Sequence, residues 1–238
     1  LTFPGLYGLL ARVYLDTYHY LEKNLAYVSV KTHYHATLND KAQFQLAVTL
    51  DDVLHSSYVA EPLKVLDSSP ISDGAAALIM TNSKKILSEA SVSCNILATE
   101  TASDTIGLNN RERLDELIAT KIAADKAFSK ARISRKDIQV AEVHDCFTTH
   151  ELVLYEDLGF SARGQAKEDI EAGTFTLTGG LPVNPVHSAE LGEPERLATG
   201  LSGRGRTAHG QGKGRRGRGP QKRSAGTEGM VPRPRRFQ

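Results

Sequence analysis

The sequence predicts an α/β fold built in layers, because stretches with helical spacing alternate with short apolar runs that suit buried strands. The first signal lies between Pro4 and Leu21, where apolar residues recur every three or four positions. The second is Ala75–Met80 (AAALIM), a wholly apolar run that directly follows the turn-rich segment Asp67–Gly74. Helices and strands in this order favour helices packed on a sheet.

The remaining helices follow from the same spacing and from capping residues. We expect helices at Leu21–His33, Thr49–Leu54, Asn109–Ile133 and Thr149–Leu158, and the last of these ends at Gly159, a suitable C-terminal cap. Thr49 can serve as an N-cap because its hydroxyl can accept a backbone N–H.

Three further segments have an extended pattern, and one is expected to be a loop. Val59–Leu66 contains Pro62 and should be extended, while Val92–Ala98 and Asp137–Val143 (DIQVAEV) are expected to be strands. The polar stretch His33–Phe44 is expected to be a loop that bends at Asn39-Asp40.

The composition excludes several classes of protein. With 238 residues, 24% charged and 40% hydrophobic, the chain can bury a sizeable core, and it is neither collagen-like, disulfide-rich nor wholly disordered. No stretch approaches the ~20 apolar residues that span a bilayer. Two cysteines, Cys94 and Cys146, favour a reducing, cytoplasmic setting. The first residues do not resemble a signal peptide, and a chain opening this way is typical of a fragment.

The charge divides the chain into an acidic body and a basic tail. Residues 201–238 carry 11 Lys and Arg, nine Gly and a single acidic residue, Glu228. They show no apolar periodicity, so we expect this tail to be disordered. Its Arg-Gly pairs resemble an RNA-binding tail, whereas the abrupt change of composition favours out-of-frame sequence.

A catalytic motif is expected at His144-Asp145-Cys146-Phe147, where a predicted strand passes into a loop and a helix. Sites in α/β proteins lie at such strand ends. Imidazole, carboxylate and thiol together provide a base, an orienting group and a proton carrier or nucleophile. The local sequence fits equally well with Cys146 packing as a small apolar side chain.

Several collinear segments resemble the thiolase superfamily, and more narrowly the sterol-carrier-protein-x type and its archaeal relatives. The resemblance covers about residues 1–185 and rests on these stretches: TFPGLYGLLARVY, LAYVSVKTHYHATLNDKAQFQ, VLHSSYVAEPLKVLD with the SSPISDGAAALIM that directly follows it, VAEVHDCFTTHELVLYEDLGF and GGLPVNP. It implies part of a five-layer αβαβα fold. Residues 1–66 would be the loop domain, 67–90 the last strand of the N-terminal half with a linker, 91–200 an incomplete C-terminal half and 201–238 the tail.

The resemblance also implies acyl transfer between coenzyme A thioesters, with acyl-CoA as substrate and no permanently bound cofactor. His144 would stabilise the enolate oxygen, and Cys146 would take or give the α-carbon proton. Both roles make chemical sense because a thioester α-proton is only weakly acidic and the enolate needs donors.

Four residues are expected to bind coenzyme A. Lys31 lies in the segment similar to the loop domain and is expected to contact a phosphate; a solvated charge is the alternative. Ser69, Ser72 and Gly74 can approach the ligand or simply form a turn. No metal site is expected, although His33 and His35 are spaced as possible ligands.

Two features of the family pattern are missing from the sequence. The nucleophilic cysteine would precede Leu1, and the Gly-His-Pro loop is replaced after Pro185, so we expect no turnover by this chain alone. The resemblance implies a homo-oligomer, and partners such as a hydroxymethylglutaryl-CoA synthase and a zinc-ribbon/OB-fold protein. The alternatives are a non-catalytic coenzyme A-binding subunit, a nucleic-acid-associated protein, and a Cys-His hydrolase.

Overall fold

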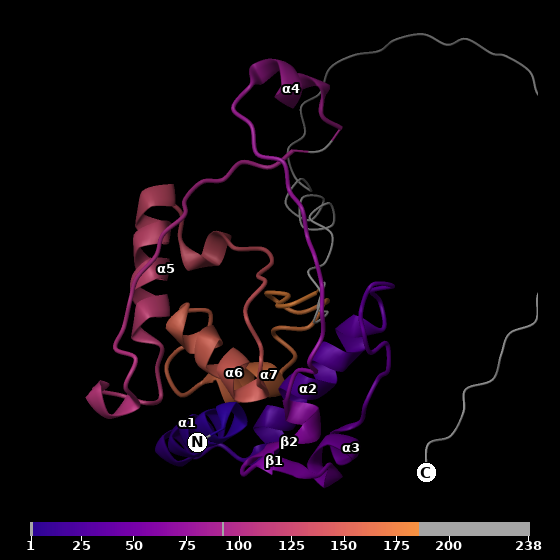
Figure 1. The fold of residues 1–238 in the computed structure, drawn as a ribbon, viewed down its shortest axis with the longest axis vertical. Coiled ribbons are helices and arrows are strands. Elements are labelled where there is room, and N and C mark those ends of the chain that lie inside the picture. Colours follow the sequence, from indigo (N-terminus) through magenta and orange to yellow (C-terminus); the bar gives the residue numbers. More distant parts are fainter. Residues whose placement is uncertain (1, 92, 186–238) are drawn as a thin grey trace, which may run out of the picture. The chain divides into compact units, whose positions relative to one another are not determined.

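The computed structural model describes residues 2–91 and 93–185, which lie in the first of two units of the chain, Leu1–Arg204. Helices and two strands alternate in it with long irregular segments (Figure 1). The helices are α1 Phe3–Tyr18, α2 Glu22–Ala36, α3 Leu50–His55, α4 Lys84–Glu89, α5 Ile118–Ala131, α6 Thr148–Asp157 and α7 Ala166–Glu171. The strands are β1 Tyr58–Ala60 and β2 Leu63–Lys64, and single 3-10 turns cover Val65–Asp67, Leu108–Asn110 and Arg135–Asp137.

Helix α1 confirms the first predicted helix. It begins after Thr2, whose hydroxyl accepts the backbone N–H of Gly5 at 3.2 Å. Its buried face includes Ala11, Tyr14 and Leu15, which follow the predicted three- and four-residue spacing. This face packs against α6.

Helix α2 is longer than predicted and packs against α3, α6 and α7. The sequence places its end at His33, but the helix continues to Ala36, so the predicted loop begins only at Thr37. The polar residues at this end stay helical because His35 is fully buried and its Nδ1 contacts the Asn184 carbonyl oxygen at 2.9 Å. Tertiary contacts therefore outweigh the local turn propensity.

Helix α3 and the hairpin after it agree well with the sequence. Thr49 caps α3 as predicted, because its hydroxyl accepts the N–H of Asp52 at 3.1 Å. The stretch predicted to be extended forms the antiparallel pair β1–β2, which turns at the cis peptide bond between Glu61 and Pro62.

Helix α6 is the centre of the packed core, and α1, α2 and α7 lie against it (Figure 1). Its predicted bounds are confirmed within one residue, and Gly159 adopts the left-handed φ of +75° just after its C-terminus. Leu152 and Tyr155 are completely buried, and the Tyr155 ring stacks on Phe175 at 3.7 Å between centroids.

The chain has the mixed helix and strand composition that the sequence predicts, but three individual strand predictions are wrong. In the described residues β1 and β2 form the only sheet, so Ala75–Met80, Val92–Ala98 and Asp137–Val143 lie outside any sheet. Val92 itself is outside the described residues, and Asp137–Val143 makes one isolated bridge, from Ala141 to Val183. A strand forms only with a neighbour to bond. Ile79 illustrates the result, since 94% of it is exposed.

The long helix predicted at Asn109–Ile133 begins only at Ile118. Just before this point the backbone bonds to a side chain instead of continuing a helix, because Asp157 Oδ2 accepts the N–H of Leu117 at 2.7 Å. Asp115 is held separately by Arg113 and by the Tyr18 hydroxyl. The predicted disordered tail, 201–238, lies outside the described residues. No helix in the described part of the chain is long and apolar enough to cross a bilayer.

Substitutions on α1 and α2 test this core. Leu25 on α2 is fully buried, so Leu25→Ala should lower the free energy of unfolding by about 2–5 kcal/mol through the lost contacts and the cavity left behind. Leu9 on α1 is 46% exposed, and Leu9→Ala should change that free energy far less. Urea denaturation followed by circular dichroism measures both, and equal losses would contradict the packing described.

Candidate active site

Two loops that are far apart in the sequence meet to form the candidate site. Ser68 and Phe147 form an isolated antiparallel bridge, and the Ser69 N–H donates to the Cys146 carbonyl oxygen at 3.0 Å. These backbone hydrogen bonds hold the turn segment that begins at Asp67 against the loop His144–Phe147. Both segments were singled out in the sequence, and the structure brings them together.

The buried carboxylate of Asp67 connects this junction to the surrounding elements. Its Oδ2 accepts the backbone N–H of Lys64 at 3.0 Å, and its Oδ1 accepts the Thr148 hydroxyl at 2.9 Å. Burial raises the pKa of Asp67, while these two hydrogen bonds act in the opposite direction. The Asp67 carboxylate therefore links the end of the hairpin, at Lys64, to the first turn of α6, at Thr148.

Cys146 is buried, with 7% of the residue exposed. Burial raises the pKa of its thiol, and the neighbouring Asp145 carboxylate adds to the effect. The Tyr7 hydroxyl and the backbone N–H of Phe147 lower the same pKa by hydrogen bonding to the sulfur. The thiol form of Cys146 is therefore favoured at rest.

His144 is exposed, and its ring meets the ring of His150 edge-on at 5.5 Å between centroids. His150 belongs to the first turn of α6 and also lies 5.5 Å from the Tyr7 ring. Burial, together with the nearby His144, lowers the pKa of His150 to about 4, so this imidazole is neutral at physiological pH.

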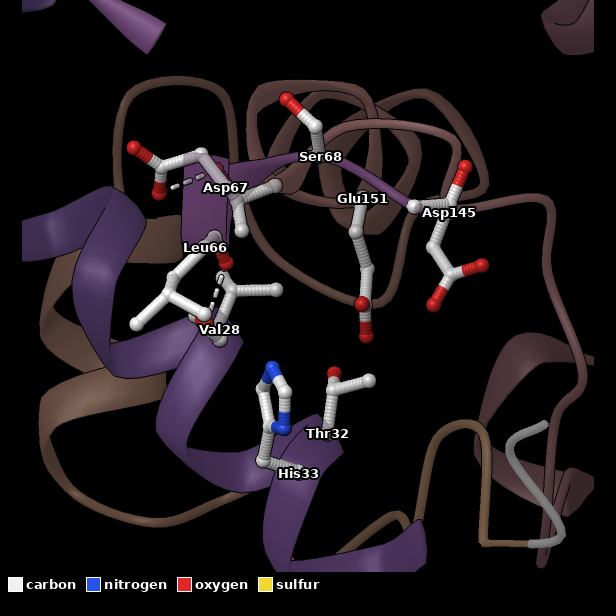
Figure 2. Close-up of a pocket in the computed structure, with 11 residues that line it drawn as sticks. Val28, Thr32, His33, Leu66, Asp67, Ser68, Asp145 and Glu151 are labelled. Atoms are coloured by element: carbon white, nitrogen blue, oxygen red, sulfur yellow. Dashed lines mark hydrogen bonds between the residues drawn. The ribbon is translucent and has the colours of Figure 1, made fainter. Parts of the chain in front are cut away.

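A small polar pocket of about 50 Å³ lies beside the loop junction. Figure 2 shows the Glu151 carboxylate directed toward the Thr32 hydroxyl, with Asp145 nearby. In the described part of the chain Glu151 Oε2 and Thr32 Oγ1 are buried without a hydrogen-bond partner. A cavity of this size holds only a few water molecules. Its lining residues are Val28, Ser29, Thr32, His33, Leu66, Asp67, Ser68, Ser69, Asp145, Thr148 and Glu151.

Lys31 is buried against Glu151 and is not among the residues that line this pocket. Its ammonium forms an ion pair with Glu151, in which the two side chains are 2% and 0% exposed, and it donates to the Val183 carbonyl oxygen at 3.0 Å. The Tyr155 hydroxyl donates to the same Glu151 carboxylate. In this arrangement the ammonium balances the buried charge of Glu151 and does not reach the surface. The phosphate contact expected for Lys31 from the sequence would require it to do so.

The other expected binding residues are only partly brought together. Ser69 lines the pocket, whereas Ser72 and Gly74 lie farther along the same segment, outside the lining. His33 lines the pocket, while His35 is buried against Asn184, so the His-x-His pair does not converge. Across residues 2–91 and 93–185, no group of three or more His, Cys, Asp or Glu could hold a metal ion.

Sequence reasoning missed Tyr7, Asp67, His150 and Glu151. Tyr7 sits in an ordinary amphipathic pattern, and Asp67 opens a segment that resembles a simple turn. His150 and Glu151 offered a weak signal, because two polar residues follow the His144–Phe147 loop on a helix in which every residue except His150 is buried.

Comparison with known proteins identifies the family of this part of the chain. Residues 101–187 match the family described as thiolase C-terminal domain-like. Over these residues, the chain belongs to the thiolase family. An acetyl-CoA acetyltransferase of Methanocaldococcus jannaschii is 46% identical over 204 residues, covering 84% of this chain and 52% of the relative. Its counterpart in Methanothermobacter thermautotrophicus is 40% identical over 201 residues, with the same coverage of 84% and 52%.

More distant similarities agree with the thiolase assignment. Human sterol carrier protein 2 is 32% identical over 187 residues, covering 76% of this chain and 34% of that protein. A solved structure described as "Ltp2-ChsH2(DUF35) aldolase" superposes with a TM-score of 0.70 at 24% identity, covering 83% of this chain and 53% of that one, and it supports the fold. The thiolase-like chain spans about half the length of the archaeal relatives it matches.

The buried ion pair predicts a large effect on stability. Lys31→Met leaves the Glu151 carboxylate buried without its cation, so the free energy of unfolding should fall by about 3–5 kcal/mol. The matched control is Lys23→Met, because the Lys23–Glu171 pair is 3.2 Å apart and its side chains are 44% and 36% exposed. That change should cost at most about 1 kcal/mol. Chemical denaturation compares the two, and a Lys31→Met loss as small as the control would contradict the burial of the pair.

His150 predicts a dependence of stability on pH. Its pKa in the folded chain is lowered, so its contribution is fully present above the unfolded value, about 6.5. That contribution is lost as the pH falls toward the folded value of about 4. His150→Phe should therefore flatten the loss of unfolding free energy across this interval. The exposed His55→Phe serves as the control, and identical pH profiles for the parent and His150→Phe would contradict the prediction.

Proposed function

We propose that this chain takes part in thiolase-type acyl-CoA transfer and supplies the proton-transfer half of the active site. The observation that supports the proposal most is the loop His144–Phe147, which carries an imidazole and a thiol two residues apart and is hydrogen-bonded to the Ser68–Ser69 segment. Membership of the thiolase family over residues 101–187 gives this loop its chemical context.

The proposed reaction assigns one task to each side chain. The Cys146 thiolate takes the α-proton of an acyl-CoA thioester, so that an S–H bond forms and the C–H electron pair becomes the enolate. His144 donates a hydrogen bond to the enolate oxygen, where the negative charge develops. The raised pKa of Cys146 suits the reverse direction as well, because the resting thiol can return the proton to carbon.

Coenzyme A is proposed as a substrate rather than as a resident cofactor. The pocket of about 50 Å³ is far too small for it, so the described residues offer only part of a binding surface. Ser69, exposed at the rim of this pocket, is the proposed contact of this chain, with Ser72 and Gly74 next along the segment. We do not propose a phosphate contact for Lys31, because its ammonium is already paired.

An N-terminal thiolase half, on the same polypeptide or on another, is proposed to complete the active site. Ile71, Leu78, Ile79 and Met80 are between 70% and 101% exposed in a segment that pairs with no strand of the described chain. The archaeal relatives are about twice as long as the matched region. The N-terminal half of a thiolase fits this surface, since it could offer a neighbouring strand and a nucleophilic cysteine. Oligomerisation, a cytoplasmic location and the larger partners named above remain predictions.

An assay of acetoacetyl-CoA thiolysis tests these proposals. The chain alone should show no turnover, and adding the N-terminal half of the Methanocaldococcus jannaschii acetyltransferase should produce it. Cys146→Ala should then lower the rate by about 10²–10⁴-fold, the usual contribution of general acid–base catalysis. Cys94→Ser is the matched control and should leave the rate unchanged, since Cys94 is exposed.

Three outcomes would contradict parts of the proposal. Turnover by residues 1–238 alone would remove the need for an N-terminal thiolase half. Full activity of Cys146→Ala in the complemented enzyme would remove the role of Cys146. Saturable coenzyme A binding that never leads to turnover would favour the alternative of a non-catalytic subunit.

A further inference from the structure

His150 contacts the loop His144–Phe147 from α6 and has no part in the reaction proposed above. Its ring lies 5.5 Å from the His144 ring between centroids, with an angle of 81° between the two ring planes. The edge of one imidazole therefore points at the other ring, an arrangement that aromatic rings favour. The two residues belong to different elements, because His144 precedes α6 and His150 lies in the first turn of that helix.

His150 is itself held by its backbone and by neighbouring side chains. Its backbone N–H donates to the Phe147 carbonyl oxygen at 2.9 Å. Its ring lies 5.5 Å from the Tyr7 ring, and the Tyr7 ring lies 4.6 Å from that of Phe147. The side chain also lines a small cavity of about 20 Å³, together with Leu10 and Val153. His150 is therefore fixed by contacts with α1 and with its own helix.

His144, in contrast, is an exposed side chain on a loop. Such a side chain samples several rotamers unless a neighbour selects one of them. The His150 ring is a neighbour of this kind, because it is held in place and contacts the His144 ring. It brings no repelling charge at neutral pH, since burial lowers its pKa to about 4. His150 thus offers a fixed, uncharged surface on which the exposed imidazole packs.

We propose that His150 is a positioning residue for His144, whose ring it holds in the orientation that donates a hydrogen bond to the enolate oxygen. The proposal rests on the role proposed above for His144. In this role His150 exchanges no proton and acts through the contact between the two rings. A phenyl ring at position 150 should therefore replace the imidazole, whereas a methyl group should not.

Nuclear magnetic resonance of the full chain, with ¹³C-labelled histidine, tests the contact without any turnover. The ring protons of His144 and His150 should show a nuclear Overhauser effect in the parent chain. His150→Ala should shift the His144 ring resonances and increase the motion of that ring, while His150→Phe should keep it ordered. The exposed His55 is the internal control, and its ring signals should not change. Absence of the Overhauser effect in the parent chain would overturn the proposal, and that measurement needs no variant to fold.

The complemented enzyme tests whether the contact matters for catalysis. His150→Ala should lower kcat roughly two- to tenfold with little change in KM, because losing one aromatic contact reduces the population of correctly oriented His144 by about that factor. His150→Phe should retain most of kcat, and the control His55→Ala should retain all of it. In a His144→Ala chain, the further change His150→Ala should have no effect, because no ring remains to be held.

Two kinetic outcomes would overturn the proposal. One is an equal loss of kcat in His150→Phe and His150→Ala, and the other is a further loss when His150→Ala is added to His144→Ala. Full activity of His144→Ala would instead overturn the proposed function of that residue. The Overhauser contact is measured independently of turnover, so the two kinds of failure are distinguishable.

Discussion

The fold depends on partners for the three carboxylates that α6 carries into the core. Glu151, Glu156 and Asp157 are all buried, and an uncompensated carboxylate in such a position would cost several kcal/mol. Glu156 accepts the Tyr14 and Tyr20 hydroxyls at 2.7 and 2.9 Å, and Asp157 accepts the Leu117 N–H at 2.7 Å. Arg163 pairs with both of these carboxylates.

These partners come from nearly every element around α6. Tyr14 comes from α1, Lys31 from α2, Leu117 from the start of α5 and Arg163 from the turn before α7. Each carboxylate therefore fixes a neighbouring element in position as well as satisfying its own charge. These contacts also hold the candidate site in position, because the loop His144–Phe147 leads directly into the first turn of α6 and the pocket borders Glu151.

The elements that the sequence predicts correctly are those set by interactions between residues close together in the chain. Helices α1, α3 and α6 could be predicted because apolar spacing, the Thr49 cap and Gly159 all act within a few residues. The strand at Ala75–Met80 was predicted from its composition, yet strand formation depends on a neighbour that the described residues do not contain. The start of α5 was missed for the same reason, since Asp157, far along the chain, takes the Leu117 N–H. In the site, the His144–Phe147 loop was evident from its residue types, whereas Tyr7, Asp67 and Glu151 matter only through contacts with distant residues.

The hydrogen bond from Thr148 to Asp67 joins residues 81 positions apart in the chain. Closing a loop of that length costs entropy before any contact compensates for it, and contacts of such long sequence separation slow folding. The helices can form from local signals, but the surroundings of the Cys146 thiol exist only once this distant contact has closed. A nascent or locally opened chain therefore carries a thiol without the buried surroundings that the folded site gives it.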